Sequence, residues 1–134
     1  MPTIKKTLIA LLFATTILIV PVASKAQIPD QIILSLKTGN AKVLSNYFNQ
    51  NVELVVLDND NVYSKAQAQQ IVNNFFTTHK PEDFISIHDG GKEGAKYVIG
   101  NLVTKNGNFR VYFLLKQNQG KDYIHQLRIE TEKQ

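Results

Sequence analysis

Two side chains of this sequence are suited to acid-base chemistry, the carboxylate of Asp89 and the imidazole of His125. Strand alternation places Asp89 on the same face as Ile85 and Ile87, and it places His125 on the same face as Leu127. If both faces line one pocket, the carboxylate orients the imidazole, which then acts as a general base. However, Asp89 also precedes two glycines, which is ordinary turn chemistry, and a histidine near a strand end commonly serves in packing. The pair is therefore the basis of a catalytic alternative.

Four polar side chains are expected on the other face of the same strands. Arg110 is predicted to lie beside Glu130, and Tyr112 beside Arg128. Tyrosine and arginine are favoured anchors at interfaces, so this face is predicted to bind a partner. At a minimum, the four residues form a polar ladder of cross-strand pairs, each contributing roughly 0.2–1 kcal/mol. The two interpretations are compatible, because apolar neighbours on this face favour a partner that covers them.

The opposite, apolar face of the last strands predicts a ligand pocket. Phe113 lies on this face, and Gly100 opposite it leaves either a space or a bend in the sheet. Tyr123 and His125 add the only polar groups. A cavity that holds a ligand needs mainly apolar lining and one or two directional polar groups. We therefore expect any open pocket here to be apolar and modest in size.

Neither a metal nor a cofactor is predicted. His79, His88 and His125 come from distant segments and lack the spacing of zinc ligands. Residues 58–61 (DNDN) lack the glycine and the distal glutamate of a calcium loop, so they are predicted to form a turn. The sequence contains neither a glycine-rich phosphate loop nor a Gly-x-Ser-x-Gly elbow.

The N-terminal segment indicates export. Two lysines precede an uncharged apolar run over residues 7–20, and Ser24 and Ala26 supply a small-x-small cleavage site. This pattern predicts a secretory signal peptide over residues 1–26 and a mature domain over residues 27–134, located in the periplasm or outside the cell. The apolar run is shorter than the roughly 20 residues of a membrane span, and an uncleaved anchor is the alternative. Because the sequence has no cysteine, it has neither a lipid-attachment residue nor disulfides.

Cleavage would also change the charge of the protein. The full sequence has a formal charge of +4, and residues 1–26 hold three lysines and no acidic residue, so the mature domain is close to +1. No cluster of lysine and arginine remains in the mature domain, which argues against a nucleic-acid partner. A mature domain of this length supports one hydrophobic core.

The hydrophobic periodicity predicts an α+β fold. Helices are expected over residues 29–39, 40–48 and 64–79, and the last begins with a capping box formed by Ser64 and Gln67. Strands are expected over residues 52–57, 84–89, 97–105, 109–116 and 123–130. Consecutive strands that follow helices predict an antiparallel sheet with the helices on one face.

The dipeptide Asn106-Gly107 is a strong signal for a two-residue hairpin turn. A turn centred on it pairs Gly100 with Phe113. The final strand is then expected to place Leu127 opposite Phe113, and His125 opposite Leu115.

Four segments of the sequence resemble a secreted bacteroidete family: residues 64–68 (SKAQA), 97–104 (YVIGNLVT), 109–112 (FRVY) and 127–130 (LRIE). That family is catalogued as domain of unknown function 4783, and its topology is similar to the nuclear-transport-factor-2-like superfamily. The resemblance implies a cone of three helices against a curved antiparallel sheet, in the order α-α-β-α-β-β-β-β. It transfers no catalytic residue, although some enzymes of the superfamily use Asp and His in the cone. Dimerisation through the sheet is common in the superfamily.

These observations favour an exported, non-catalytic domain that holds a small apolar ligand in the cone, or a protein or a second copy of itself on the open sheet face. The alternative is a small cofactor-free enzyme of dehydratase or isomerase type that uses Asp89 and His125.

Overall fold

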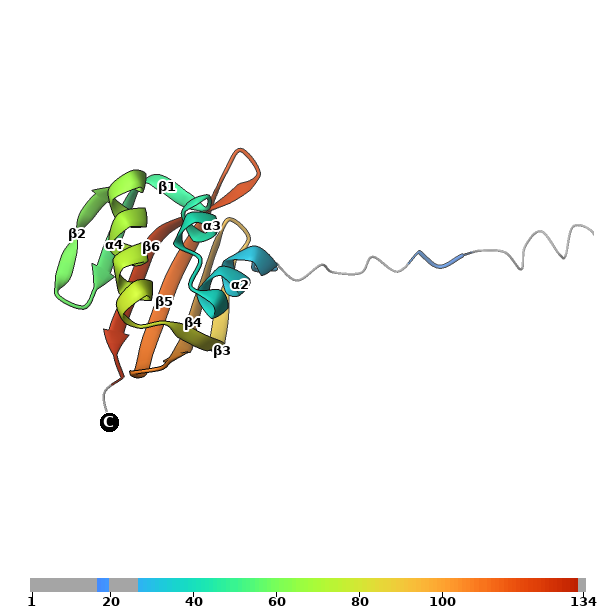
Figure 1. Ribbon diagram of the computed structural model, residues 1–134. Helices are drawn as coiled ribbons and strands as arrows, with labels where there is room; N and C mark the ends of the chain where they lie inside the picture. The colour runs from blue at the N-terminus through green and yellow to red at the C-terminus, as the bar shows by residue number, and fades with distance from the viewer. Residues whose placement is uncertain (1–16, 20–26, 133–134) are drawn as a thin grey trace, which may run out of the picture.

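The computed structural model describes residues 17–19 and 27–132. The predicted cleavage site and almost all of the predicted signal peptide therefore lie outside the described residues. The elements in sequence order are α2 (Asp30–Thr38), α3 (Ala41–Ser45), β1 (Phe48–Val56), β2 (Asn59–Ser64), α4 (Lys65–Thr78), β3 (Pro81–Lys92), β4 (Ala95–Thr104), β5 (Gly107–Asn118) and β6 (Lys121–Thr131) (Figure 1). Among the described residues, no helix has the length and apolar character needed to cross a membrane.

The helices begin and end where local signals require it. Asn40 caps α3 by accepting a hydrogen bond from the Val43 amide at 3.0 Å. Ser64 and Gln67 form the predicted capping box of α4, which is thereby fixed at its first turn. Gly39 ends α2 with a φ of 70°, in the left-handed region that glycine adopts easily. The second helix is shorter than predicted, because β1 begins at Phe48.

All six strands form one sheet in the order β2-β1-β6-β5-β4-β3. The sequence interpretation missed β2, an edge strand whose residues NDNVYS are mostly polar and almost entirely exposed. Of the predicted turn at 58–61, only Asp58 lies in the turn, since β2 begins at Asn59. The sheet is also not wholly antiparallel, because β1 and β6 pair in parallel.

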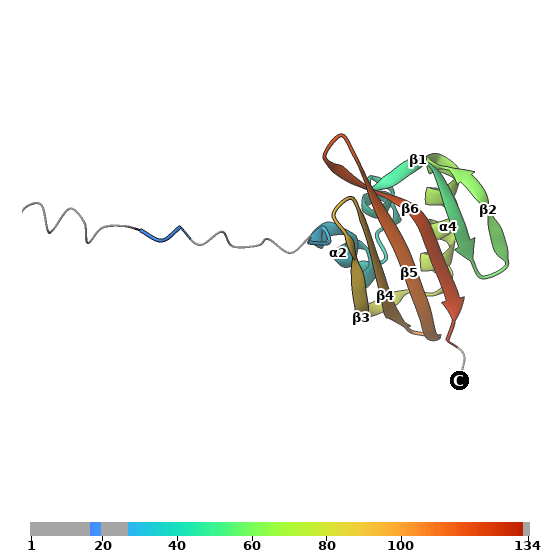
Figure 2. The same cartoon turned by 180° about the vertical axis from the view of Figure 1, so that it is seen from behind.

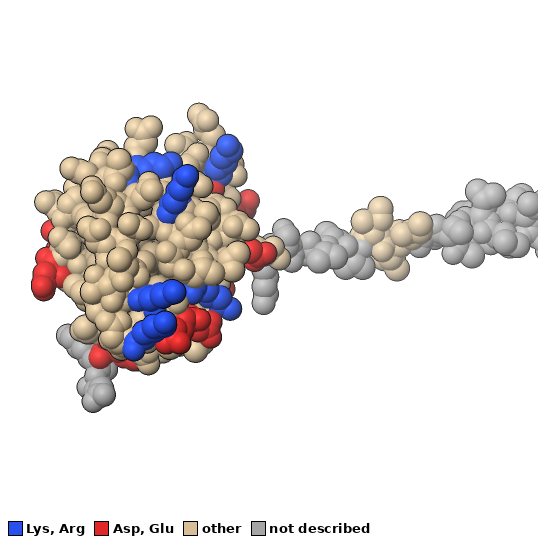
Figure 3. Space-filling model, viewed as in Figure 1, with Lys and Arg blue, Asp and Glu red and all other residues tan. Residues whose placement is uncertain are grey.

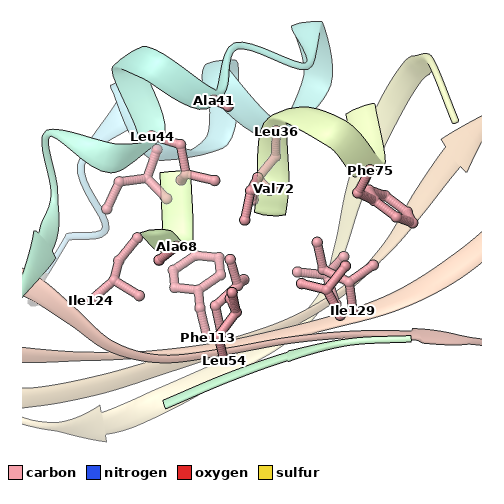
Figure 4. Close-up of a cluster of buried hydrophobic side chains, with 14 of the residues drawn as sticks. Leu36, Ala41, Leu44, Leu54, Ala68, Val72, Phe75, Phe113, Ile124 and Ile129 are labelled. Carbon is pink, nitrogen blue, oxygen red and sulfur yellow. The ribbon is translucent and has the colours of Figure 1, made fainter. Parts of the chain in front are cut away.

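The core lies between the helices and one face of the sheet. Figure 4 shows Leu36, Leu44 and Val72 from the helices directed toward Phe113 and Ile129 from the strands. Leu36, Leu44, Val72, Phe113 and Ile129 each have 0% exposure. Because α2, α3 and α4 all cover this one face, the view from behind shows the other face of the sheet without a helix over it (Figure 2).

The strand register of the β4–β5 hairpin differs by two residues from the predicted register. Thr104 pairs with Gly107, so Lys105 and Asn106 are the central residues of the turn. The predicted turn required a positive φ at both Asn106 and Gly107, and only Gly107 has one. Gly100 consequently pairs with Val111 and not with Phe113. A shift of two residues keeps every side chain on its predicted face.

Charge is dispersed over the helix side of the molecule. In Figure 3 acidic side chains lie next to basic ones, and much of this side carries neither. Lys37 and Asp83 form one such exposed pair, with an Nζ to Oδ1 distance of 3.6 Å. Because acidic and basic side chains lie next to one another on this side, its described residues form no extended basic area that could bind a polyanion.

Candidate functional site

The face of the sheet that points away from the helices brings the predicted interaction residues together. In the structure Arg110 pairs with Glu130, and Tyr112 pairs with Arg128, as predicted. Alternation along the strands gives this face its other members. We define the open face as the outward side chains of β1, β4, β5 and β6, namely Glu53, Val55, Tyr97, Ile99, Asn101, Val103, Arg110, Tyr112, Leu114, Lys116, Tyr123, His125, Gln126, Arg128 and Glu130.

Polar contacts on the open face run along and across the strands. Arg128 contacts Glu130 on the same strand, with 3.0 Å between the guanidinium nitrogen and Oε1. Glu130 lies beside Arg110 in the register, but Arg110 donates to Asn101 at 3.1 Å. These side chains remain about half exposed, so each contact alone contributes little to stability. Together they hold the charged groups of the face in defined positions.

A row of rings runs from the open face on β5 and β4 to the neighbouring strand β3. The Tyr97 and Tyr112 rings lie 6.3 Å apart, and the Tyr97 hydroxyl lies 3.0 Å from Nε2 of His88. The sequence interpretation placed Tyr97 on this face but missed His88. The register places His88 opposite Ile99, an outward residue of β4.

Two adjoining hollows mark the part of the open face nearest β2. One, of about 320 Å³, is lined in part by Val55, Asp60 and Arg128. The other, of about 210 Å³, is lined in part by Leu114, Lys116 and His125. Glu53, Val62 and Gln126 line both hollows. Val62 is 57% exposed, so apolar surface is available within a polar frame.

His125 belongs to the open face and not to the core, which corrects the predicted pocket. The β5–β6 register shifts between Leu114 and Leu115, and Ile124 takes the position opposite Leu115 that was predicted for His125. Burial lowers the pKa of His125 most, the Lys116 ammonium lowers it further, and the Glu53 carboxylate opposes both effects. The imidazole therefore favours its neutral form.

Asp89 and His125 do not form a dyad. Asp89 lies on β3 opposite Val98, a buried residue of the helix-covered side, whereas His125 faces outward from β6. The predicted grouping of Asp89 with Ile85 and Ile87 is also wrong, because the bulge at residue 87 interrupts the alternation. Both isoleucines are about half exposed. The two groups of the catalytic alternative thus lie on different faces and different strands.

The other residues of the predicted pocket also separate. Phe113 is fully buried in the core. A Cβ atom built on Gly100 would lie 2.3 Å from Cζ of Phe84, so the Phe84 ring already occupies the space predicted at this glycine. Tyr123 pairs with Lys116 and faces outward. The interior at Gly100 and Phe113 is therefore filled by side chains.

The histidines are dispersed in the part of the protein that the structure describes. His79 packs between Phe75 and Phe109, with ring centroids 4.9 and 4.8 Å away. No group of three or more metal-ligating side chains occurs among these described residues.

Comparison with known proteins gives a family match over most of the sequence. The family described as Domain of unknown function (DUF4783) matches residues 29–130. A solved structure of a DUF4783 family protein from Bacteroides ovatus ATCC 8483 is 35% identical, with a TM-score of 0.76, covering 82% of this chain and 100% of that chain. A second, from Bacteroides uniformis ATCC 8492, is 33% identical, with a TM-score of 0.76, covering 81% of this chain and 100% of that chain.

More distant structures show the fold alone. The structure titled "Rd1NTF2_04 with long sheet" is 17% identical, with a TM-score of 0.60, and the match covers 75% of this chain and 94% of that chain. The comparison with curated proteins finds no match.

Proposed function

Because the chain belongs to the DUF4783 family, a family defined without an activity, we propose its function from its own surface: it is an exported, non-catalytic interaction domain whose open face binds a second copy of itself. The observation that carries this proposal is the gathering of Tyr97, Tyr112, Arg110 and Arg128 with half-buried aliphatic residues on a face that no described helix covers. Aromatic and arginine side chains on an uncovered apolar surface are typical of interfaces.

A second copy suits this face by charge. The open face presents Arg110, Lys116 and Arg128 together with Glu53 and Glu130. In a two-fold dimer the same patch meets itself, so a patch with both signs of charge can place cations of one copy over anions of the other. A strongly acidic or basic partner would require one sign to dominate, and neither does.

A second copy also suits this face by size. The outward side of the whole six-stranded sheet, with strands about 4.8 Å apart, about ten residues long and with a rise of roughly 3.3 Å per residue, covers roughly 900 Å², and the open face is the larger part of it. A standard interface buries about 800 Å² on each partner. The sheet is therefore large enough to support a stable dimer.

Tyr112→Asp tests this proposal. The substitution places a carboxylate at the centre of the open face without touching the core, so we expect it to dissociate the dimer while the domain stays folded. Sedimentation measures the oligomeric state, and circular dichroism measures folding. Lys105→Asp, in the exposed β4–β5 turn, is the matched control and should leave the dimer intact. A monomeric wild-type protein, or a Tyr112→Asp variant that dimerises normally, would contradict the proposal.

Export is the second part of the proposal and is supported by the pattern of residues 1–26. We expect protein recovered from the periplasm or the medium of the native host to begin at or within a few residues of Gln27. Mass spectrometry of the intact protein measures this directly. Exported protein that still carries Met1 would contradict signal-peptide cleavage.

A further inference from the structure

Lys96 is a charged residue in a core position. It lies on the helix-covered side of β4, where it alternates with the outward residues Tyr97 and Ile99, and it is only 7% exposed. An ammonium withdrawn from water destabilises the fold unless it is paired and hydrogen-bonded. The contacts of Lys96 therefore identify groups that the fold must keep in place.

Two groups from distant parts of the sequence satisfy Lys96. Its Nζ lies 3.3 Å from Oδ2 of Asp122 on β6, in a pair whose side chains are 8% and 16% exposed. The same Nζ donates to the backbone carbonyl of Gln27 at 3.0 Å. Lys96 thus holds Gln27 close to Asp122, although the two residues are far apart in the sequence.

The second oxygen of this carboxylate lacks a donor. Oδ1 of Asp122 is buried and has no hydrogen-bond partner in the structure. A buried carboxylate oxygen without a donor has lost its hydrogen bonds to water and gained none from the protein. Buried polar groups in native proteins nearly always have a hydrogen-bond partner. Oδ1 of Asp122 therefore lacks a hydrogen-bond donor.

We propose that Asp122 Oδ1 binds the α-ammonium of Gln27 once residues 1–26 have been removed, an inference that rests on the cleavage proposed above but not on dimerisation. The Gln27 carbonyl is already held by Lys96, and the nitrogen of the same residue lies within about 4 Å of that carbonyl oxygen. Cleavage converts this nitrogen from an amide with one hydrogen into an ammonium with three. Each oxygen of Asp122 then accepts from one cation, and the new N-terminus is fastened to the sheet.

Cyclisation of the N-terminal glutamine provides the test. In that reaction the α-amine nitrogen bonds to Cδ of the same glutamine, the bond between Cδ and Nε2 breaks, and ammonia leaves. An amine that is protonated and held by Asp122 is a poor nucleophile, so Gln27 should cyclise slowly. The full-length protein is expressed with its own signal segment, the exported protein is purified, and mass spectrometry follows the loss of ammonia with time.

Asp122→Asn removes the charge that holds the amine, and we expect cyclisation to become about tenfold faster, the factor that corresponds to a charge-assisted hydrogen bond. Asp83→Asn is the control, because it neutralises an exposed carboxylate that also pairs with a lysine. Equal cyclisation rates in the wild type and Asp122→Asn would overturn the inference, as would glutamine found already cyclised in freshly exported wild-type protein.

If the Asp122→Asn variant fails to fold, a second measurement tests the inference without that substitution. A protein that keeps Ala26 in front of Gln27 has an unchanged domain but carries its ammonium one residue farther away. Its Tm should be lower than that of the protein beginning at Gln27 by about 4 °C. Equal Tm values would overturn the inference. If the exported protein begins at Gln27 but fails these tests, the ion pair alone is refuted. If it begins elsewhere, the proposed cleavage site is refuted.

Discussion

At the scale of single residues, Gly100 shows why the interior holds no ligand at this position. A Cβ atom there would lie 2.3 Å from Cζ of Phe84 and 2.8 Å from the carbonyl oxygen of Ile85. The ring contact could yield by a rotation of Phe84, but the backbone contact cannot. The glycine is therefore a point of close packing between β3 and β4, not the wall of a cavity.

Gly100→Ala should consequently destabilise the domain by about 1–3 kcal/mol, the usual cost of overpacking a core. Urea denaturation monitored by circular dichroism measures this change in the free energy of unfolding. Combining the substitution with Phe84→Leu should recover part of the loss, because the two side chains compete for the same space. A Gly100→Ala variant as stable as the wild type would mean that the interior at this position is open.

His125 offers a second test at this scale, through its surroundings on the open face. Its pKa lies below the usual 6.5 because of burial first and Lys116 second, while Glu53 acts in the opposite direction. We expect Lys116→Gln to raise the pKa without restoring it fully, and Glu53→Gln to lower it further. Proton NMR titration of the imidazole measures all three values, and identical values would contradict the placement of His125 between these two charges.

The same shift sets the sign of a pH effect on stability. Since the unfolded protein binds a proton at His125 more readily than the folded protein, the free energy of unfolding falls as pH decreases through the unfolded pKa near 6.5. The loss continues until the pH reaches the lowered pKa of the folded state. His125→Asn should remove this part of the pH dependence while leaving the carboxylate contributions at lower pH.

At the scale of elements, the sequence predicted those features that depend on strong local signals. The capping box at Ser64 and Gln67 and the glycine after α2 correctly placed two helix boundaries. Apolar alternation along β4 and β5 correctly divided their side chains between the two faces. That division was sufficient to group Arg110, Tyr112, Arg128 and Glu130 on one surface before the strand partners were known.

The elements that could not be predicted depend on pairing or on a single inserted residue. β2 has no apolar alternation of its own and forms a strand because β1 lies beside it. The bulges near residues 87 and 125 each reverse the alternation, and nothing in the local sequence marks them. A one-residue shift moves a side chain to the opposite face, which is why the faces predicted for Ile85 and His125 were wrong while those predicted for residues 109–114 were correct.

At the scale of the whole molecule, the six strands and three helices share a single core. Leu54 from β1 and Leu102 from β4 are buried to 1% and 0% exposure in that same cluster. The β1–β6 pairing joins the β1–β2 hairpin to the other four strands in one sheet. A single core joined in this way should unfold in one cooperative transition.

Leu54→Ala tests this cooperativity. Removing a buried leucine side chain should cost about 2–5 kcal/mol. In a cooperative domain, native-state hydrogen exchange should show that amides of β4 lose as much protection as amides of β1, although β4 does not pair with the mutated strand. If β4 keeps its protection while β1 loses it, the two parts of the sheet unfold separately.

The parallel pairing of β1 with β6 also has a consequence for the order in which the protein can form. Leu54 pairs with Leu127, so the contact at the middle of the sheet closes a loop that contains β2, α4, β3, β4 and β5. Pairings so remote in sequence are slow to form, because the polypeptide loses much of its entropy before they yield any stabilisation. During synthesis from the N-terminus, β1 has its partner β2 on one edge but no partner on the other edge until β6 has been added. The nascent polypeptide therefore carries an unpaired edge on β1 until β6 has been synthesised.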